Sequence, residues 1–581
     1  MDGVRDGRSP GESPWPMRLL GLAVALLVTA PILAPGFVLL RDMVFVPRQD
    51  LDLDALGLGG TLPRAVPVDS VMALLTAFVP GALVQKAVLL AIVFAAVLGA
   101  ARLVPPGDDG RRGPAAAVAG LVYGWSPYLA ERLLEGHWTL LLAYAALPWI
   151  ARSALRLRAE EPGALPRLVL ACAPAALTPT GAVLAGVTVV FALAGRRSLV
   201  PAGGAVLALA LPWIVAGAVH PFGGSSDPAG VAAFAARGDG RGGVVLSLLG
   251  GGGIWNAAAV PPGRASALVP LVTLLLVALA AVGAFAAGRP RGAALRLLLL
   301  AVCGLVLSLA ASVPGTAAVL QVVVGSVPGG GLLRDAQKWI ALWMLPLAVF
   351  AGLGTRRLTV LAREHVADIA AGATVAIAVS LPLLAVPDLV WGVGGRLQPV
   401  AWPAAWQQVR DAVAEDRAPG DVLALPAGVY RAFPWNDGRP QVDPAARWLP
   451  RRVVADDTLV VGDREVEGED RRARTVLTAT DDPTELARLG IGWVLVERGT
   501  PGPPVPREVT ALPLVVDTPE LSLYRVPGAL PGPRATGPRT AAVVAAHAVA
   551  LGTVIWALLW TAIRSSTVPL RRPPSRKWVP E

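Results

Sequence analysis

The segment ALVQKAVLLAIVFAAVLGAARLV (residues 82–104) sets the fold class, and PPGDDGRRG (105–113) follows it directly. The first stretch is long and apolar enough to cross a membrane as one helix. The second places Arg111 and Arg112 beside its end, where basic residues mark the cytoplasmic side. About a dozen apolar runs of about 15–24 residues repeat this design. The sequence therefore predicts a polytopic membrane protein.

Composition excludes several other classes. Hydrophobic residues make up 54% of the 581 and charged residues only 16%, and the mean hydropathy is +0.59. Cys172 and Cys303 both fall inside apolar runs, which argues against a disulfide framework or a cysteine-ligated zinc site. The net charge of +10 sits in short loops beside the apolar runs and not along one soluble face, so we expect no nucleic-acid partner.

Twelve spans and their arginine clusters define the predicted topology. Every strong cluster between spans falls on one side if both termini are cytoplasmic, as expected of a multi-pass plasma-membrane protein. The first span is long for a signal peptide and lacks a clear cleavage site, so it is expected to remain as an anchor. The spans are predicted at about 18–40, 82–104, 114–127, 138–152, 167–178, 180–194, 199–216, 265–287, 297–313, 338–354, 366–387 and 540–563.

The predicted organisation has five parts: a cytoplasmic N-terminus (1–17), a transmembrane module of about 11 spans (18–387), an extracytoplasmic domain (388–538), a last span (540–563) and a basic cytoplasmic tail (564–581). The extracytoplasmic domain holds about half of the 41 acidic residues. It contains four strand-like runs and one short helical run, which indicate an α/β domain. These runs are DVLALP (421–426), TLVV (458–461), GWVLVE (492–497) and LSLYRV (521–526) for strands, and PTELARLG (483–490) for the helix.

The loops between spans have fewer signals. Residues 41–81 predict an outer loop with a surface helix near 68–79. The span at 297–313 is expected to lead to the outer side, where the Gly/Pro-rich stretch 314–337 follows. GGSS (223–226) and GGGG (250–253) lack a strand–loop–helix context, so both are interpreted as flexible loop.

The first polar cluster, LLRDMVFVPRQDLDLD (39–54), follows the first span. Asp42 stands at the membrane edge, where a carboxylate can act as general base toward an acceptor hydroxyl, and Asp50 is the second candidate. The alternative is interfacial charge that ends a span.

The second cluster, SPYLAERLLEGHW (126–138), lies between two very apolar spans, where ionisable groups are costly unless paired or used. Helical spacing predicts one shared face for Tyr128, Glu131, Arg132 and Glu135, and His137 follows as a candidate acid/base group or a hydrogen-bonding partner for a sugar. The alternative is a salt-bridge cap satisfied within the turn.

The third cluster, GGGLLRDAQKW (329–339), places Arg334 and Lys338 at the entrance of a late span. Two cations at an outer membrane boundary suit a phosphate or pyrophosphate headgroup. The alternative is an interfacial anchor that includes Asp335 and Trp339. The sequence contains no Walker A loop, GxSxG elbow or HExxH motif, and no ligand spacing requires a metal.

The combination of an Asp after the first span, the SPYLAERLLEGHW turn and the LRDAQKW motif resembles the large membrane glycosyltransferases of the GT-C fold. The actinobacterial cell-wall arabinofuranosyl- and mannosyltransferases and the related YfhO-like membrane proteins are the most similar groups. The resemblance covers the whole predicted architecture: about 12 transmembrane helices with an extracytoplasmic α/β domain before the last one.

The resemblance implies transfer of a sugar from a polyprenyl-phosphate donor to a cell-envelope glycan or glycolipid on the outer face of the membrane. It implies Asp42 as base, with Asp50 next, and assigns the donor phosphate to Arg334 and Lys338. The sugar and acceptor pocket would use Glu131, Arg132, Glu135 and His137, with Tyr128 on the same helical face. Asp42 lacks the adjacent second acid of many GT-C members. A divalent metal is compatible with the resemblance, and no cofactor is required.

Two other functions remain open from the sequence. A transporter or lipid-glycan flippase would need ionisable residues along a route through the spans, whereas the charges here concentrate at the outer edge. A non-catalytic glycan-binding scaffold for other envelope proteins would need no such route.

Overall fold

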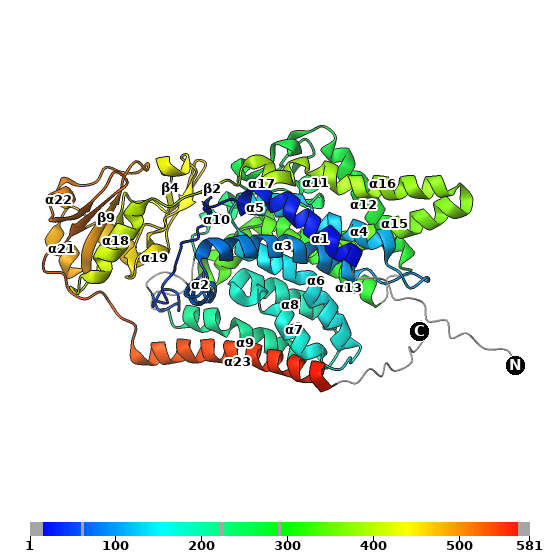
Figure 1. The fold of residues 1–581 in the computed structure, drawn as a ribbon, viewed down its shortest axis with the longest axis horizontal. Coiled ribbons are helices and arrows are strands. Elements are labelled where there is room, and N and C mark those ends of the chain that lie inside the picture. The colour runs from blue at the N-terminus through cyan, green and yellow to red at the C-terminus, as the bar shows by residue number, and fades with distance from the viewer. Residues whose placement is uncertain (1–14, 60–62, 221–225, 289–291, 568–581) are drawn as a thin grey trace.

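The computed structural model describes residues 15–59, 63–220, 226–288 and 292–567. A long helical body carries a smaller sheet domain at one end (Figure 1). The described chain begins with α1 (Trp15–Thr29) and finishes with α23 (Gly537–Thr567), and both of these chain ends lie at the end of the body away from the sheet domain (Figure 1). Arg289 and Arg291, most of the predicted tail and the first fourteen residues lie outside the described residues.

Nine helical segments in the described residues are long and apolar enough to cross a membrane, and they coincide with nine of the twelve predicted spans. The other three predicted spans form the shorter helices α4 (Gly113–Gly124), α7 (Ala164–Cys172) and α8 (Pro179–Leu193). At 1.5 Å per residue these rise only about 18, 14 and 22 Å, less than the ~30 Å hydrocarbon core. The nine are α1 with η1 (Trp15–Leu33), α3 (Gly81–Leu103), α6 (Trp138–Arg158), α9 (Leu199–Ala218), α12 (Val269–Ala286), α13 with η5 (Ala293–Ser312), η7 with α15 (Gln337–His365), α16 (Asp368–Ala385) and α23.

Helix α15 (Ala341–His365) is the most enclosed of these helices and packs against α4, α12, α13 and α16. Gly283 of α12 and Gly354 of α15 allow close approach, since a Cβ at either would collide with backbone of the facing helix. Small residues at such crossings let apolar helices gain packing contacts that lipid alone does not supply.

The first predicted span is too long at its C-terminal end. The α-helix ends at Thr29, a 3-10 turn continues to Leu33, and Phe37–Val38 then form strand β1. This strand pairs antiparallel with β2 (Pro399–Val400) at the start of the sheet domain. The main chain is therefore hydrogen-bonded to a segment some 360 residues away, and that pairing prevents the helix from continuing to residue 40.

The sheet domain contains a five-stranded mixed sheet in the order β10–β11–β9–β3–β6. Helix α18 (Ala404–Glu415) packs on one face, against Val422 and Ala424, and the opposite face packs on α20, α21 and α22. Successive side chains of β3 point to opposite faces of the sheet, so this strand contributes buried residues to both faces. The predicted runs at 421–426, 492–497, 521–526 and 483–490 are confirmed as β3 (Asp421–Leu425), β9 (Ile491–Glu497), β11 (Leu521–Arg525) and α21 (Pro483–Arg488); the others are β6 (Val453–Val454), β10 (Leu514–Asp517), α20 (Arg471–Leu477) and α22 (Arg507–Thr510).

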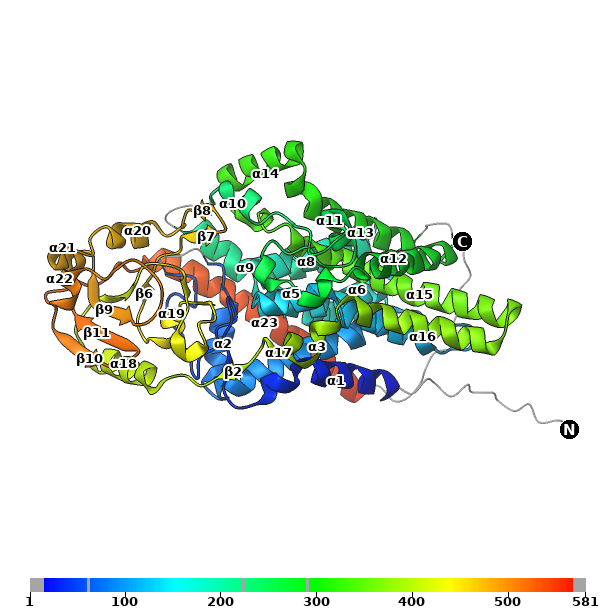
Figure 2. The same ribbon diagram turned by 90° about the horizontal axis from the view of Figure 1, so that it is seen from above.

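The connections between the long helices contain further helices, one of which the sequence predicts. Helix α14 (Pro314–Ser326) forms within the Gly/Pro-rich stretch 314–337 and projects from the body (Figure 2). A proline in its first turn and the alanines after it favour this helix. The surface helix near 68–79 is confirmed as α2 (Val68–Thr76). The remaining elements are α5 (Pro127–Leu134), α10 (Ala229–Ala233), α11 (Gly243–Leu249), α17 (Val390–Gly395), α19 (Ala445–Trp448), β4 (Tyr430–Arg431), β5 (Gln441–Val442), β7 (Leu459–Val461) and β8 (Arg464–Val466).

Candidate functional site

Helix α5 forms the centre of the candidate site. Ser126 caps its first turn by accepting from the Leu129 amide (3.3 Å), and Pro127 occupies the first helical position. All eight of its residues are buried, although two of them, Glu131 and Arg132, are ionisable. Burial of charges at this depth requires specific partners, because an unpaired buried charge costs several kcal/mol.

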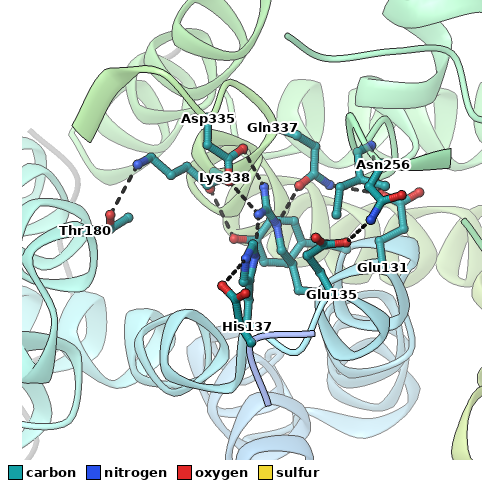
Figure 3. A network of polar contacts seen from close by, with 12 residues as sticks. Glu131, Glu135, His137, Thr180, Asn256, Asp335, Gln337 and Lys338 are labelled. Carbon is teal, nitrogen blue, oxygen red and sulfur yellow. Dashed lines mark hydrogen bonds and ion pairs between the residues drawn. The ribbon is translucent and has the colours of Figure 1, made fainter. Parts of the chain in front are cut away.

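Arg132 is fully buried and makes a two-pronged contact with Asp335, 2.7 and 3.0 Å from its two carboxylate oxygens. Its Nε donates to Gln337 (2.8 Å), and its Nη1 also reaches His137 Nδ1 (2.8 Å; Figure 3). Burial opposes ionisation of Asp335, but the charge and hydrogen bonds of Arg132 outweigh it and hold the pKa of that carboxyl well below its usual range. This ion pair joins α5 to the LRDAQKW segment, 203 residues later.

His137 joins Arg132 to Asp42. A guanidinium can only donate, so Nδ1 of His137 accepts, and Nε2 carries the proton that faces Asp42 Oδ2 at 3.1 Å. Tyr430, in the sheet domain, donates to the other oxygen of Asp42 (2.7 Å). Burial opposes ionisation of Asp42, yet the hydrogen bonds from His137 and Tyr430 lower its pKa below the usual value. The side chain remains 42% exposed, so an ionised and oriented carboxylate stands open to a ligand.

Gly136 allows the loop that carries Asp42 to lie directly on the end of α5. Its φ is +78°, and a Cβ there would come closer than 3.0 Å to backbone atoms of Leu40, Asp42 and Met43. The Asp42 amide donates to the Glu135 carbonyl across this contact (3.3 Å). Arg41 donates to the Leu134 carbonyl and lies 3.8 Å from the Glu135 carboxylate.

Glu131 and Glu135 are paired with the loop between α11 and α12, not with Arg132. Glu131 accepts from the Ile254 amide (3.1 Å) and from Gln337 (3.1 Å), while Glu135 accepts from Asn256 (2.8 Å; Figure 3). Burial first, and then the charge of Asp239, raise the pKa of Glu131 well above its usual value. The contacts with the α11–α12 loop and with the LRDAQKW segment replace the predicted salt-bridge cap within the turn.

The glycines at 250–253 are not a flexible loop, which corrects the sequence interpretation. A Cβ on Gly252 would collide with the Asp239 carboxylate and come within 2.9 Å of Glu131 Oε1. Asp239 is in turn paired with Arg264 (2.8 Å), and both side chains are buried. The loop is glycine-rich because its backbone approaches a buried carboxylate cluster. Of the other predicted loop, GGSS, only Ser226 lies within the described residues.

A cavity of about 540 Å³ opens beside this network. His137, Asp335 and Lys338 line it, and the first turns of α6 and α8 point at it. Lys338 donates to Thr180 in the first turn of α8 (3.2 Å), so a cation and a helix N-terminus meet at one wall. Trp213, Ile214 and Leu140 give the cavity an apolar side. The predicted cations Arg334 and Lys338 thus line one space, although they are not on one helical turn.

The mouth of the cavity lies against the sheet domain. Glu469 of that domain contacts both Arg64, from the first loop, and Arg334 (3.4 Å). Burial, together with the neighbouring Arg64, lowers the pKa of Arg334 to about 10. The two arginines at the mouth are therefore already paired with a carboxylate of the sheet domain.

Of the predicted site residues, His137, Arg334 and Lys338 line the cavity, and Asp42 contacts its wall through His137. The other predicted residues do not line it: Asp50, Tyr128, Glu131, Arg132 and Glu135. Asp50 pairs with Arg410 of the sheet domain, and Tyr128 donates to the Lys338 carbonyl (3.1 Å) from a fully buried position. Among the described residues, no group of three or more His, Cys, Asp or Glu side chains could hold a metal ion.

Several residues of the site were not predicted as site residues from the sequence. Asp335 and Gln337 lie within the predicted LRDAQKW motif, which could have suggested them. Tyr430, Arg64 and Glu469 belong to ordinary loop and hairpin sequence, and only the docking of the sheet domain brings them to the cavity.

No family model matches the chain, and no curated protein matches it either. Among solved structures, the arabinofuranosyltransferase AftD from Mycobacteria superposes with a TM-score of 0.55 at 15% identity, over 91% of this chain and 40% of AftD. A mutant of AftD gives 0.53 at 17% identity, over 90% and 42%. ArnT from Cupriavidus metallidurans bound to undecaprenyl phosphate gives only 0.41 at 14% identity, over 89% of this chain and 99% of ArnT. The chain therefore shares its fold with AftD, in agreement with the architecture that the sequence resemblance implies, and spans less than half the length of AftD.

Proposed function

We propose that this chain is a membrane glycosyltransferase that moves a sugar from a polyprenyl-phosphate donor to a cell-envelope glycan or glycolipid. The observation that carries the proposal is the position of Asp42. Its carboxylate is held between Tyr430 of the sheet domain and His137 at the wall of the cavity. A base is thus available between a space suited to a phosphate and a domain suited to an acceptor.

The donor would occupy the cavity. Its phosphate suits the cations Arg334 and Lys338 and the N-terminus of α8, while the apolar side formed by Trp213 and Ile214 suits the first isoprene units. Lys338 and Arg334 would bind the phosphate more tightly as its negative charge grows when the sugar leaves.

The acceptor would approach Asp42 from the sheet domain. Asp42 would take the proton of the acceptor hydroxyl while its oxygen attacks the anomeric carbon and the bond from that carbon to the phosphate oxygen breaks. The proton ends on Asp42 and the electron pair on the departing polyprenyl phosphate. The pKa of Asp42 lies below the usual value, so the carboxylate is ionised at neutral pH. The hydrogen bonds from His137 and Tyr430 that lower this pKa also reduce its basicity, so their role is to orient the carboxylate.

Arg132 and Glu131 would position the site without touching the reacting atoms. Arg132 sets the tautomer of His137, which orients Asp42. Glu131 holds Gln337, and Gln337 holds Arg132. Glu135 and Tyr128 would fix the backbone around this chain of contacts.

The sheet domain would face the extracytoplasmic side of the plasma membrane, with both termini in the cytoplasm. The arginine-rich connections support this orientation. The described chain also begins and ends at the opposite end of the body from the sheet domain (Figure 1). Chemistry on that side favours a donor already loaded on a lipid, because nucleotide sugars are made inside the cell.

The test is sugar transfer by purified protein in nanodiscs, with radiolabelled polyprenyl-phosphate arabinose or mannose and cell-wall glycan acceptors. Arabinose comes first because AftD, which shares the fold, is an arabinofuranosyltransferase. Asp42→Asn should lower kcat by about 10²- to 10⁴-fold, the usual contribution of a general base. Asp50→Asn, whose carboxylate pairs with Arg410, is the matched control and should transfer at the wild-type rate.

Two results would contradict the proposal. Equal transfer by Asp42→Asn and wild type would remove Asp42 as base. Absence of transfer by folded wild type from either donor would favour a non-catalytic scaffold or a transporter.

A further inference from the structure

A second cavity, of about 500 Å³, lies between α3, α6 and α7. It is separate from the candidate site and shares no lining residue with the first cavity. It includes the ends of α3 and α6 that point away from the sheet domain (Figure 1). Its lining combines four arginines with apolar side chains: Arg102, Arg152, Arg156 and Arg167, with Ile92, Leu142, Trp149 and Leu170 among the apolar ones.

On both α3 and α6, apolar residues of the cavity lining come before the arginines along the chain. Ile92 precedes Arg102 by ten residues on α3, and Leu142 precedes Arg152 by ten residues on α6. At 1.5 Å per residue each interval is about 15 Å, which is half the thickness of the ~30 Å hydrocarbon core. The cavity therefore has the polarity and the length of one lipid leaflet.

The guanidinium groups are oriented but their charge is not neutralised. Arg152 donates to the Arg102 carbonyl (2.6 Å), and Arg102 lies 5.1 Å from the centre of the Trp149 ring. Trp149 is fixed in turn by its hydrogen bond to the Ala95 carbonyl (3.0 Å). Within the described chain, the only carboxylate in salt-bridge range of these four arginines is Glu161, which pairs with Arg156 (3.5 Å). Positive charge therefore remains at the mouth.

Membrane orientation alone does not account for this arrangement. Basic residues that only orient a span do not have to surround a cavity, and Arg363 at the end of α15 is an example. It is exposed, lies 3.5 Å from Asp368, and lines neither cavity. The four arginines instead come from three helices and converge on one apolar space.

We infer that this cavity binds an anionic phospholipid, with the phosphate among Arg102, Arg152, Arg156 and Arg167 and one acyl chain along Ile92, Leu142 and Leu170. The inference does not depend on the proposed function, because it concerns a different site. A bound lipid would fill the gap between α3, α6 and α7.

The experiment is native mass spectrometry of the protein released from mixed micelles with phosphatidylglycerol or phosphatidylcholine of the same chain length. Phosphatidylglycerol should be retained preferentially. The double variant Arg152→Gln/Arg156→Gln should bind it about 30-fold more weakly, because each basic residue near an anionic headgroup contributes about 1 kcal/mol, or about fivefold. Arg363→Gln, the matched control, should bind as wild type.

A second variant tests the apolar part of the cavity. Ala171→Phe would place a ring in the cavity while it leaves all four arginines in place, so it should also weaken phosphatidylglycerol binding. Glycerol phosphate, the headgroup without its chains, should not bind. Equal retention of the two lipids, an equal loss in Arg363→Gln, or binding of glycerol phosphate as tight as that of the lipid would each overturn the inference.

Discussion

Separating Arg132 from Asp335 should be the most destabilising single change at the candidate site. Arg132 is fully buried and Asp335 is largely enclosed, and their two-pronged contact is supported by Gln337 and His137. Removing one partner leaves the other charge buried without compensation, which costs about 3–5 kcal/mol. Arg132→Met and Asp335→Leu should each lose that amount. The double variant should lose much less than the sum of the two, because no unpaired charge remains.

The assay is equilibrium unfolding of the purified protein in mixed micelles, followed by far-ultraviolet circular dichroism, which reports the helical body. Arg363→Met is the control, because it removes an exposed Arg–Asp pair and should change the unfolding free energy by less than about 1 kcal/mol. Wild-type stability in either single variant would refute the reasoning. Costs that simply add in the double variant would show that the two side chains do not stabilise each other.

Two further changes test the neighbouring contacts. Gly136→Ala would push the loop that carries Asp42 away from α5, because the new Cβ collides with backbone at Asp42. The kcat for sugar transfer should therefore fall while the donor KM changes little. An unchanged kcat would contradict this prediction. Glu131→Gln tests the buried carboxyl, whose pKa is raised by burial and by Asp239. Folded Glu131 keeps a proton that the unfolded chain loses above its ordinary pKa of 4.5, so this group's stabilisation falls as pH rises. In denaturant titrations between pH 5 and 8, Glu131→Gln should lack this contribution to the fall of the unfolding free energy. The same dependence of the unfolding free energy on pH in both proteins would refute the prediction.

The elements themselves were largely predictable. Apolar runs predicted the nine long helices of the described chain, because a chain in lipid must satisfy its backbone within each helix. Strands β3, β9 and β11 were predicted from their own residues, since each combines β-branched and apolar side chains in a short run. The predicted end of the first span was wrong because its outer part pairs with Pro399–Val400, which no local pattern reveals.

The candidate site was only half predictable. Composition and position identified Asp42, Arg132, His137, Arg334 and Lys338 as charges in costly places, which is a local property of the sequence. Their interactions are not local.

The chain alone could specify helices, strands and exposed charges, because those depend on neighbours within a few residues. It could not specify that Arg132 binds Asp335 or that Tyr430 binds Asp42, pairs separated by 203 and 388 residues. A buried charge requires a partner, but its own sequence surroundings do not say which one. That choice follows from the packing of the helices and from the docking of the sheet domain on the first loop.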